Sequence, residues 1–242
     1  MFDFASQRLV ITGGAGGIGS AAAEVFLRAG ASVHLVDVSQ ARLDEVAQRL
    51  APLGHVTVSV SSLESTEACR RAFSEGGGKF SGLVHMAGIF EDDPLDGSSA
   101  VWERAISSNL TSAYNAVVAY RECADQSRVC SIVLASSRSF QRGGVGVAAY
   151  SAAKGGIVGL TRTFSRELAP AIRVNCVSPG LIQTQMTTRL VEKFGEQRLA
   201  EIPLARFGDP MDVAGPIAFL CSDAAAYVTG QVLTVDGGVI NG

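Results

Sequence analysis

Short apolar runs alternate with longer segments of helical periodicity along almost the whole chain. The apolar runs are continuous or nearly so, which is typical of strands in a parallel sheet covered on both faces. They occupy residues 9–11, 33–36, 56–60, 82–86, 131–135, 173–177 and 232–235. The segments between them fit helices at about residues 17–29, 40–51, 64–75, 98–123, 150–169 and 210–222. This alternation predicts an α/β fold, with a doubly wound sheet of about seven mostly parallel strands and helices on both faces.

No linker interrupts the alternation, so we expect residues 1–242 to form a single domain. One segment, at about residues 183–207, breaks the pattern, because charged side chains are scattered there among apolar ones. It predicts one or two short amphipathic helices inserted before the last helix. A segment at that place is suited to act as a lid over a substrate.

Composition narrows the class of protein. Of the 242 residues 47% are hydrophobic and 18% are charged, which excludes a disordered chain, and a formal net charge of −3 argues against a nucleic-acid partner. No apolar stretch reaches the length of a membrane span, and the first residues lack the features of a secretory signal. The five cysteines include no C-x-x-C pair, and His34, His55 and His85 are far apart. We therefore expect a cytoplasmic protein with reduced thiols and no metal site.

The 27 glycines exceed the roughly 17 that average usage of about 7% would give. One group of them follows the first strand and precedes a helix, in a turn made of Thr12, Gly13, Gly14, Gly16, Gly17, Ile18 and Gly19. Such a turn lets the backbone approach a pyrophosphate closely and directs the N–H groups of the helix N-terminus at it. The alternative is that the glycines serve only tight packing.

Asp37 follows the second strand, 18 residues after Gly19. This is near the offset at which an acidic side chain binds the ribose 2′-hydroxyl of a dinucleotide. A carboxylate there would repel a 2′-phosphate, so we expect NAD rather than NADP. The alternative is that Asp37 caps the helix that follows.

Tyr150 and Lys154 lie four positions apart at the start of a predicted helix, so they share one face. Lys154 lies among small and apolar residues, and its positive field would favour the phenolate of Tyr150, as a general acid or base requires. The alternative is a core tyrosine beside an exposed lysine. Ser137 ends the fifth strand, 13 residues before Tyr150, where it would face the ligand crevice of such a sheet. Turn serines are common, so Ser137 gains meaning only from these partners.

Together these motifs resemble the classical short-chain dehydrogenase/reductase family, whose members have a Rossmann fold. The resemblance is carried by T-G-x-x-x-G-x-G after the first strand, the serine 13 residues before Y-x-x-x-K, and Pro179-Gly180 after the sixth strand. Further matches are Ala87-Gly88-Ile89, Asn109-Leu110, Arg173-Val174-Asn175 and Val235-Asp236-Gly237-Gly238. The segment Arg206-Phe207-Gly208-Asp209-Pro210 is most similar to the 3-oxoacyl-carrier-protein reductase-like branch.

The resemblance implies a role for each matching residue. Tyr150 would be the general acid or base, and Ser137 would hydrogen-bond the substrate oxygen. Lys154 would lower the pKa of Tyr150 and hold the nicotinamide ribose. Asn109 would anchor a water in a proton relay, unless it is only a polar kink in a long helix. Thr184 would bind the nicotinamide carboxamide, although a helix N-cap would have the same pattern.

The same resemblance places other residues at the cofactor and the substrate. The further cofactor-binding residues would be Val60, Ala87, Gly88, Pro179, Gly180 and Ile182. Ser139 and Phe140 would bind substrate beside Ser137 and Tyr150, and Phe90, Arg138, Val147, Leu181 and Met186 would line the pocket. Phe140 is bulky where relatives often have glycine, which suggests a small or flat substrate. Arg138 either pairs with a substrate carboxylate or faces solvent.

Two positions depart from the family pattern. Met86 replaces the asparagine of the usual N-A-G, and Ser59 stands where an aspartate usually contacts adenine. Both put cofactor affinity in question without touching the proton or hydride chemistry. Relatives of this type are usually homotetramers that pair the helices at residues 98–123 and 150–169.

These features predict an oxidoreductase that transfers a hydride between a nicotinamide cofactor, preferably NAD, and a secondary alcohol or ketone. The first alternative is an NADPH-dependent 3-oxoacyl-carrier-protein reductase. The second is a non-catalytic protein that senses the cofactor on the same fold, although Ser137, Tyr150 and Lys154 are all present.

Overall fold

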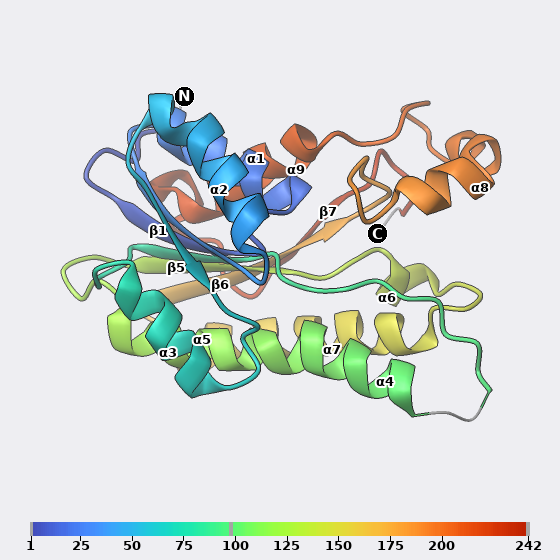
Figure 1. Cartoon of the computed structure of the whole chain (residues 1–242), viewed down its shortest axis with the longest axis horizontal. Coiled ribbons are helices and arrows are strands. Elements are labelled where there is room, and N and C mark those ends of the chain that lie inside the picture. Colours follow the sequence, from blue (N-terminus) through green and yellow to red (C-terminus); the bar gives the residue numbers. More distant parts are fainter. Residues whose placement is uncertain (1, 97–98, 241–242) are drawn as a thin grey trace.

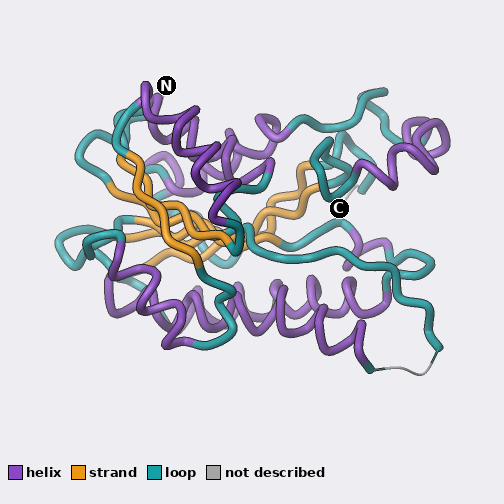
Figure 2. The backbone as a smooth tube through the Cα atoms, in the orientation of Figure 1, coloured by secondary structure: helices purple, strands orange, loops and turns teal. Residues whose placement is uncertain are grey.

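Parallel pairing joins the predicted apolar strands into one sheet. The computed structural model describes residues 2–96 and 99–240, in which the strand order is β3-β2-β1-β4-β5-β6-β7 and every pairing is parallel (Figures 1 and 2). The strands are β1 (Arg8–Thr12), β2 (Ser32–Asp37), β3 (Val56–Val60), β4 (Gly82–His85), β5 (Cys130–Ala135), β6 (Ile172–Pro179) and β7 (Val232–Val235). The predicted fold class is therefore confirmed.

Helices cover both faces of the sheet (Figure 1). One face carries α1 (Gly17–Arg28), α2 (Gln40–Leu50) and α9 (Pro210–Cys221), and the other carries α3 (Thr66–Glu75), α5 (Ser112–Cys123) and α7 (Ala148–Glu167). Each layer has its own buried apolar cluster, as continuous apolar strands require. In the first cluster α1 packs directly against α9, with Ala22 and Phe26 in the same core as Val213 and Ile217.

The sequence prediction differs from the structure in the helices beside the site. The predicted helix 98–123 is divided into α4 (Ala100–Ala105), a π-helical segment η2 (Ile106–Thr111) and α5, and its predicted start at residue 98 lies outside the described residues. The segment 183–207 contains a single helix, α8 (Thr188–Ala200). The short helices α6 (Ser139–Arg142), η1 (Ala51–Leu53) and η3 (Asp223–Ala225) were not predicted, because so few residues show no period.

The sheet order places a crevice above the carboxyl ends of β1 and β4. The chain leaves β1 toward β2 on one side, while β4 pairs with β1 on the other, so the loops that follow β1 and β4 diverge. Thr12 at the end of β1 is paired with His85 at the end of β4. The residues predicted to bind cofactor and substrate follow these strand ends. No helix within residues 2–96 and 99–240 is long and apolar enough to cross a membrane.

Candidate active site

The turn after β1 requires glycine for steric reasons. Gly13 has a positive φ of 65°, and a Cβ there would lie 2.6 Å from the backbone nitrogen of Ala87. A Cβ at Gly19 would overlap the carbonyl oxygen of Gly13. α1 begins at Gly17 with Gly16 as its N-cap, and no side chain caps it and no acidic residue lies in its first turn. The free N–H groups of this first turn therefore suit the pyrophosphate of a dinucleotide.

Asp37 ends β2 and its carboxylate is held by four donors. Oδ1 accepts hydrogen bonds from the backbone of Val38 (2.9 Å) and Ser39 (3.3 Å) and from Nη2 of Arg42 (2.9 Å), and Oδ2 accepts one from Ala15 N (3.2 Å). The side chain is buried. Ser39, and not Asp37, caps α2, so the helix-cap alternative is wrong. The bond to Ala15 ties Asp37 to the glycine turn, where the ribose role would place it.

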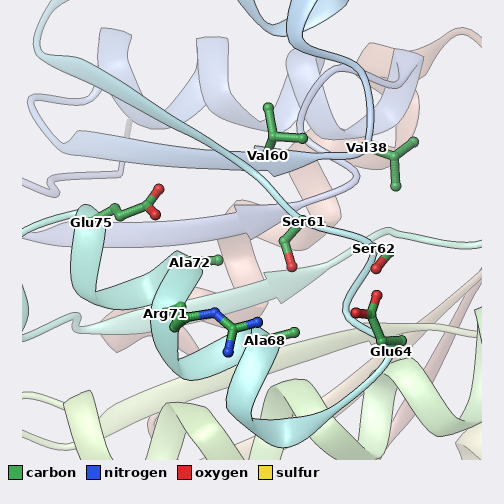
Figure 3. Close-up of a pocket in the computed structure, with 9 residues that line it drawn as sticks. All are labelled: Val38, Val60, Ser61, Ser62, Glu64, Ala68, Arg71, Ala72 and Glu75. Carbon is green, nitrogen blue, oxygen red and sulfur yellow. The ribbon is translucent and has the colours of Figure 1, made fainter.

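The end of β3 lines a pocket of about 390 Å³ beside α3 (Figure 3). Ser59 is buried, and its Oγ has no hydrogen-bond partner among the described residues, while Val60 is half exposed at the pocket. The lining residues are Val38, Val60, Ser61, Ser62, Glu64, Ala68, Arg71, Ala72 and Glu75. The pocket includes neither Tyr150 nor Ser137, so it is not the reaction site. Its Val38 and Val60 end adjoins Asp37, which fits the adenosine end of a dinucleotide, while the buried Ser59 hydroxyl does not line it.

His85, at the crevice, matches none of the motifs found in the sequence. Its Nδ1 lies 2.8 Å from Thr12 Oγ1, and its Nε2 lies 3.5 Å from Ser112 Oγ. The Ser112 hydroxyl donates to Ser108 O (2.8 Å), so Nε2 of His85 donates and Nδ1 accepts from Thr12. His85 thus connects the strand before the glycine turn with the start of α5. The sequence signal that could have revealed this contact is a histidine at the end of an apolar strand. It stands next to Met86, which occupies the position of a polar residue in the family.

Asn109 lies inside the π-helical segment and joins it to the loop after β4. Its Nδ2 donates to the carbonyl oxygens of Ile89 (3.1 Å) and Ala105 (2.9 Å), and its Oδ1 accepts from Ile89 N (3.2 Å). A Cβ at Gly88 would overlap Asn109 Oδ1 and lie 3.4 Å from Lys154 Nζ. The structure therefore brings Gly88, Asn109 and Lys154 together. Asn109 thus lies in a π-helical segment of the predicted long helix, and its hydrogen bonds fix its side chain near Lys154.

Tyr150 and Lys154 lie one turn apart near the start of α7, as the sequence predicts. Lys154 is buried, its Nζ donates to Ala135 O (3.0 Å) and lies 5.5 Å from the centre of the Tyr150 ring. The alternative of an exposed lysine is therefore wrong. Phe90 packs edge-on against the Tyr150 ring, with the ring centres 5.1 Å apart.

The pKa values of the pair correct one expectation. Burial raises the pKa of Tyr150 above its ordinary value, and a hydrogen bond with Ser137 partly opposes this rise. Burial also lowers the pKa of Lys154 to about 8. The expected lowering of the Tyr150 pKa is thus not found, because the effect of burial outweighs that of the groups that favour the phenolate.

Thr184, which comes late in the chain, lies over the glycine turn that follows β1. A Cβ at Gly17 would lie 2.7 Å from Cγ2 of Thr184, so Thr184 covers the glycine turn. The N-cap of α8 is Thr187, which makes the N-cap alternative for Thr184 wrong. Ile182 is buried and pairs with Gly208 in an isolated parallel bridge.

The predicted substrate residues surround Ser137. Ser139 N donates to Ser137 Oγ (3.2 Å), and a Cβ at Gly155 would be 3.8 Å from Phe140. Pro179 accepts a backbone hydrogen bond from Arg138 (3.1 Å), which places the end of β6 against this loop. The predicted residues from β5, β6 and α7 therefore meet at one edge of the sheet. Met186 lies farther out and is half exposed.

Comparison with known proteins decides the family. A family model described as "Enoyl-(Acyl carrier protein) reductase" matches residues 13–240. The 3-oxoacyl-[acyl-carrier-protein] reductase FabG of Thermotoga maritima is 38% identical over 237 residues, which cover 96% of each chain. The chain belongs to the short-chain dehydrogenase/reductase family. It is accordingly an NAD(P)-dependent oxidoreductase that acts on CH-OH or keto groups.

Solved structures of short-chain dehydrogenases/reductases share the whole fold. A structure from Brucella melitensis, titled "Short-chain dehydrogenase/reductase SDR:Glucose/ribitol dehydrogenase", has a TM-score of 0.94 and 37% identity and covers 100% of this chain and 99% of its own. A putative 2-deoxy-d-gluconate 3-dehydrogenase from Agrobacterium tumefaciens with bound NADP has a TM-score of 0.90 and 31% identity, with 98% of each chain covered.

The buried His85 predicts an acid-sensitive fold. Burial, and secondarily the charge of Lys154, lowers the pKa of His85 from 6.5 to about 3. The unfolded chain therefore binds a proton as the pH falls below 6.5, while the folded chain does not until about pH 3. Stability present above pH 6.5 is lost in this window, by about 1.4 kcal/mol per pH unit. We expect this one group to account for about 2 kcal/mol of the stability lost between pH 7 and pH 5.

Urea unfolding at pH 5, 6 and 7 measures the effect. His85→Asn removes the titrating group, so its stability falls less steeply with acid than that of the wild type. His55→Asn, at an exposed histidine, is the matched control and retains the wild-type slope. Equal slopes for His85→Asn and the wild type would contradict the interpretation.

Proposed function

We propose that this short-chain dehydrogenase/reductase catalyses reversible hydride transfer between NAD and a secondary alcohol or its ketone, with Tyr150 as the general acid and base. The observation that carries the proposal is the contact of Tyr150 with both Ser137 and Lys154, at the sheet edge where the N-terminus of α1 opens. A nicotinamide cofactor supplies the hydride acceptor or donor when it is bound.

The proton chemistry belongs to residues of this chain. In the direction of oxidation the Tyr150 oxygen removes the proton of the substrate hydroxyl, and in reduction it returns a proton to the carbonyl oxygen. Ser137 hydrogen-bonds the same oxygen and holds it beside Tyr150. Because Ser137 also bonds Tyr150, it opposes the effect of burial on the Tyr150 pKa. Lys154 holds the ribose hydroxyls, and Asn109 anchors the water that connects Lys154 with solvent.

The cofactor residues fit a dinucleotide. The uncapped N-terminus of α1 would accept an anion, the glycines give the backbone room, and Val60 lines the pocket at the proposed adenosine end. Thr184, which covers Gly17, would meet the carboxamide.

We expect Asp37→Asn to reduce the preference for NAD over NADP by about 10- to 100-fold, since hydrogen bonds to a charged group contribute about 1.5–3 kcal/mol. Arg42 neutralises part of the Asp37 charge, so Arg42→Gln strengthens the repulsion of a 2′-phosphate and increases the preference for NAD. Steady-state kcat/KM values with NAD(H) and NADP(H) measure both effects. Arg49→Gln, on the same helix but paired with Glu24, is the control. A wild-type preference for NADPH would overturn the role given to Asp37.

The second candidate is an NADPH-dependent 3-oxoacyl-carrier-protein reductase. Its support is the printed name of the 38% identical relative from Thermotoga maritima and the NADP in the Agrobacterium tumefaciens structure. Two observations speak against this candidate. Asp37 favours NAD, and the sequence, which is low in charge, shows no evident lysine-rich segment for an acidic carrier. A screen of neutral ketones, secondary alcohols and a 3-oxoacyl carrier thioester with both cofactors separates the two candidates. Each candidate function predicts a different combination of best substrate and best cofactor.

We also propose a cytoplasmic homotetramer. Trp102 on α4 and Tyr114 on α5 are large apolar side chains that are each half exposed on the helix layer of α7. Burial of such side chains against another subunit would stabilise an assembly. Sedimentation as a monomer at working concentration would refute this assembly.

A further inference from the structure

Three arginines lie between the reaction site and the end of α8. Arg138 follows Ser137, Arg142 ends α6, and Arg198 lies near the end of α8, which the ribbon of Figure 1 places next to α6. The charges that act most strongly on Arg138 are these two arginines and the carboxylates of Glu201 and Asp236. Three positive charges thus face two negative ones.

The two carboxylates already have other partners. Glu201 forms a two-bond ion pair with Arg142 (2.6 and 3.1 Å) and a longer contact with Arg198 (3.5 Å). Asp236 accepts backbone hydrogen bonds from Gly238 (3.0 Å) and Ile240 (2.8 Å). Neither carboxylate has a hydrogen bond to Arg138 among those found in the described part of the chain.

Unlike Arg142 and Arg198, Arg138 forms no ion pair in the described part of the chain. Its Nη1 is buried and makes no hydrogen bond within the described residues, and the same holds for the neighbouring Ser139 Oγ. The residue as a whole is partly exposed, and it is Nη1 that is turned away from water. A buried guanidinium donor without an acceptor is costly, since arginine stays charged and the lost water is not replaced. Burial and the charges of Arg142 and Arg198 lower the pKa of Arg138, as expected where an anion would be favourable.

We propose that Arg138 binds the carboxylate of the substrate, so that the reaction site takes a keto acid or hydroxy acid. The inference rests on the proposed function, because the same substrate must present its carbonyl or hydroxyl oxygen to Ser137 and Tyr150. Arg138 directly follows Ser137, and its backbone N–H donates to Pro179 O (3.1 Å), so the residue that would bind the carboxylate adjoins the one that would bind the reacting oxygen. The unpartnered Nη1 of Arg138 offers a donor to a carboxylate, and the unpartnered Ser139 hydroxyl offers a second one.

Binding of matched acids and amides tests the proposal without turnover. The probes are 3-oxobutanoate and 4-oxopentanoate, each beside its primary amide, titrated calorimetrically into the protein saturated with NAD. A ketone and an oxidised cofactor do not react, so the titration reports affinity alone. We expect at least one acid to bind the wild type tenfold or more tightly than its amide. Equal affinities for both pairs, or no measurable binding of either acid, would overturn the proposal.

Variants test whether Arg138 and the charged side chains around it cause the preference for the acid over the amide. Arg138→Gln abolishes the preference for the acid, while Arg121→Gln, which removes a charge at the far end of α5, leaves it unchanged. Glu201→Gln releases Arg142 from its ion pair and strengthens acid binding severalfold with no change for the amide. This second variant tests the proposal even if Arg138→Gln does not fold. Acid preference that persists in Arg138→Gln, or is unaffected in Glu201→Gln, would overturn it.

The proposed function and the proposed substrate class can be refuted independently of each other. Discrimination between acid and amide without hydride transfer to any ketone would refute the proposed function alone. Efficient reduction of neutral ketones without such discrimination would refute only the role of Arg138.

Discussion

Replacing Tyr150 with phenylalanine is expected to lower kcat/KM for hydride transfer by about 10²- to 10⁴-fold, the usual contribution of a positioned general acid or base. The variant loses the phenolic oxygen and with it the hydrogen bond to Ser137. The ring keeps its edge contact with Phe90, so the site retains its shape. The change in NADH absorbance measures turnover, and NADH fluorescence measures cofactor binding, which we expect to remain close to that of the wild type.

The control is Tyr227→Phe, because Tyr227 is fully exposed and its hydroxyl takes no part in the site. This variant is expected to retain full activity. If Tyr150→Phe kept more than about a tenth of wild-type activity, well above the loss typical of general acid–base catalysis, Tyr150 would be removed from the proton transfer.

Gly19→Ala is expected to weaken NADH binding by about 100-fold or more and to reduce the stability of the fold by about 1–3 kcal/mol. The added methyl group would overlap the carbonyl oxygen of Gly13, which is backbone and cannot rotate away as a side chain could. The turn must therefore open, and the N–H groups of α1 lose their alignment. Fluorescence titration with NADH and urea unfolding measure the two effects.

Gly215→Ala separates this steric effect from a general effect of alanine. Gly215 lies inside α9, and a Cβ there would meet no atom within 4 Å. We expect this variant to bind NADH normally and to gain about 0.4–1 kcal/mol of stability, because alanine restricts the unfolded chain. Wild-type NADH affinity in Gly19→Ala would show that the turn does not hold the cofactor.

The sequence was sufficient for the sheet and for the main contacts of the site. Continuous apolar strands such as Cys130–Ala135 have no polar face, so they can only lie between two helix layers, and their alternation with helices leaves few arrangements. The four-residue spacing of Tyr150 and Lys154 fixes their shared face through helix geometry alone. The strands and the shared face of Tyr150 and Lys154 depend on residues close together in the chain, so a pattern in the sequence is enough to predict them.

Features that depend on distant neighbours could not be predicted. The π-helical segment forms where Asn109 bonds Ile89, twenty residues away, and nothing in the period of the helix signals this contact. The raised pKa of Tyr150 depends on burial by surrounding elements, so spacing from Lys154 gave the wrong direction. The link from Thr12 through His85 likewise joins two strands separated by most of the N-terminal half.

The packing of α1 against α9 has a consequence for synthesis on the ribosome. The apolar face of α1, including Ala22 and Phe26, is completed only by residues of the last helix. At about 5–20 residues per second, the chain between Arg28 and Pro210 takes about 10–40 s to emerge. During that interval the first helix has no final partner, so the nascent chain exposes apolar surface of the kind that chaperones bind. The order of translation therefore makes the earliest helix among the last to reach its native environment.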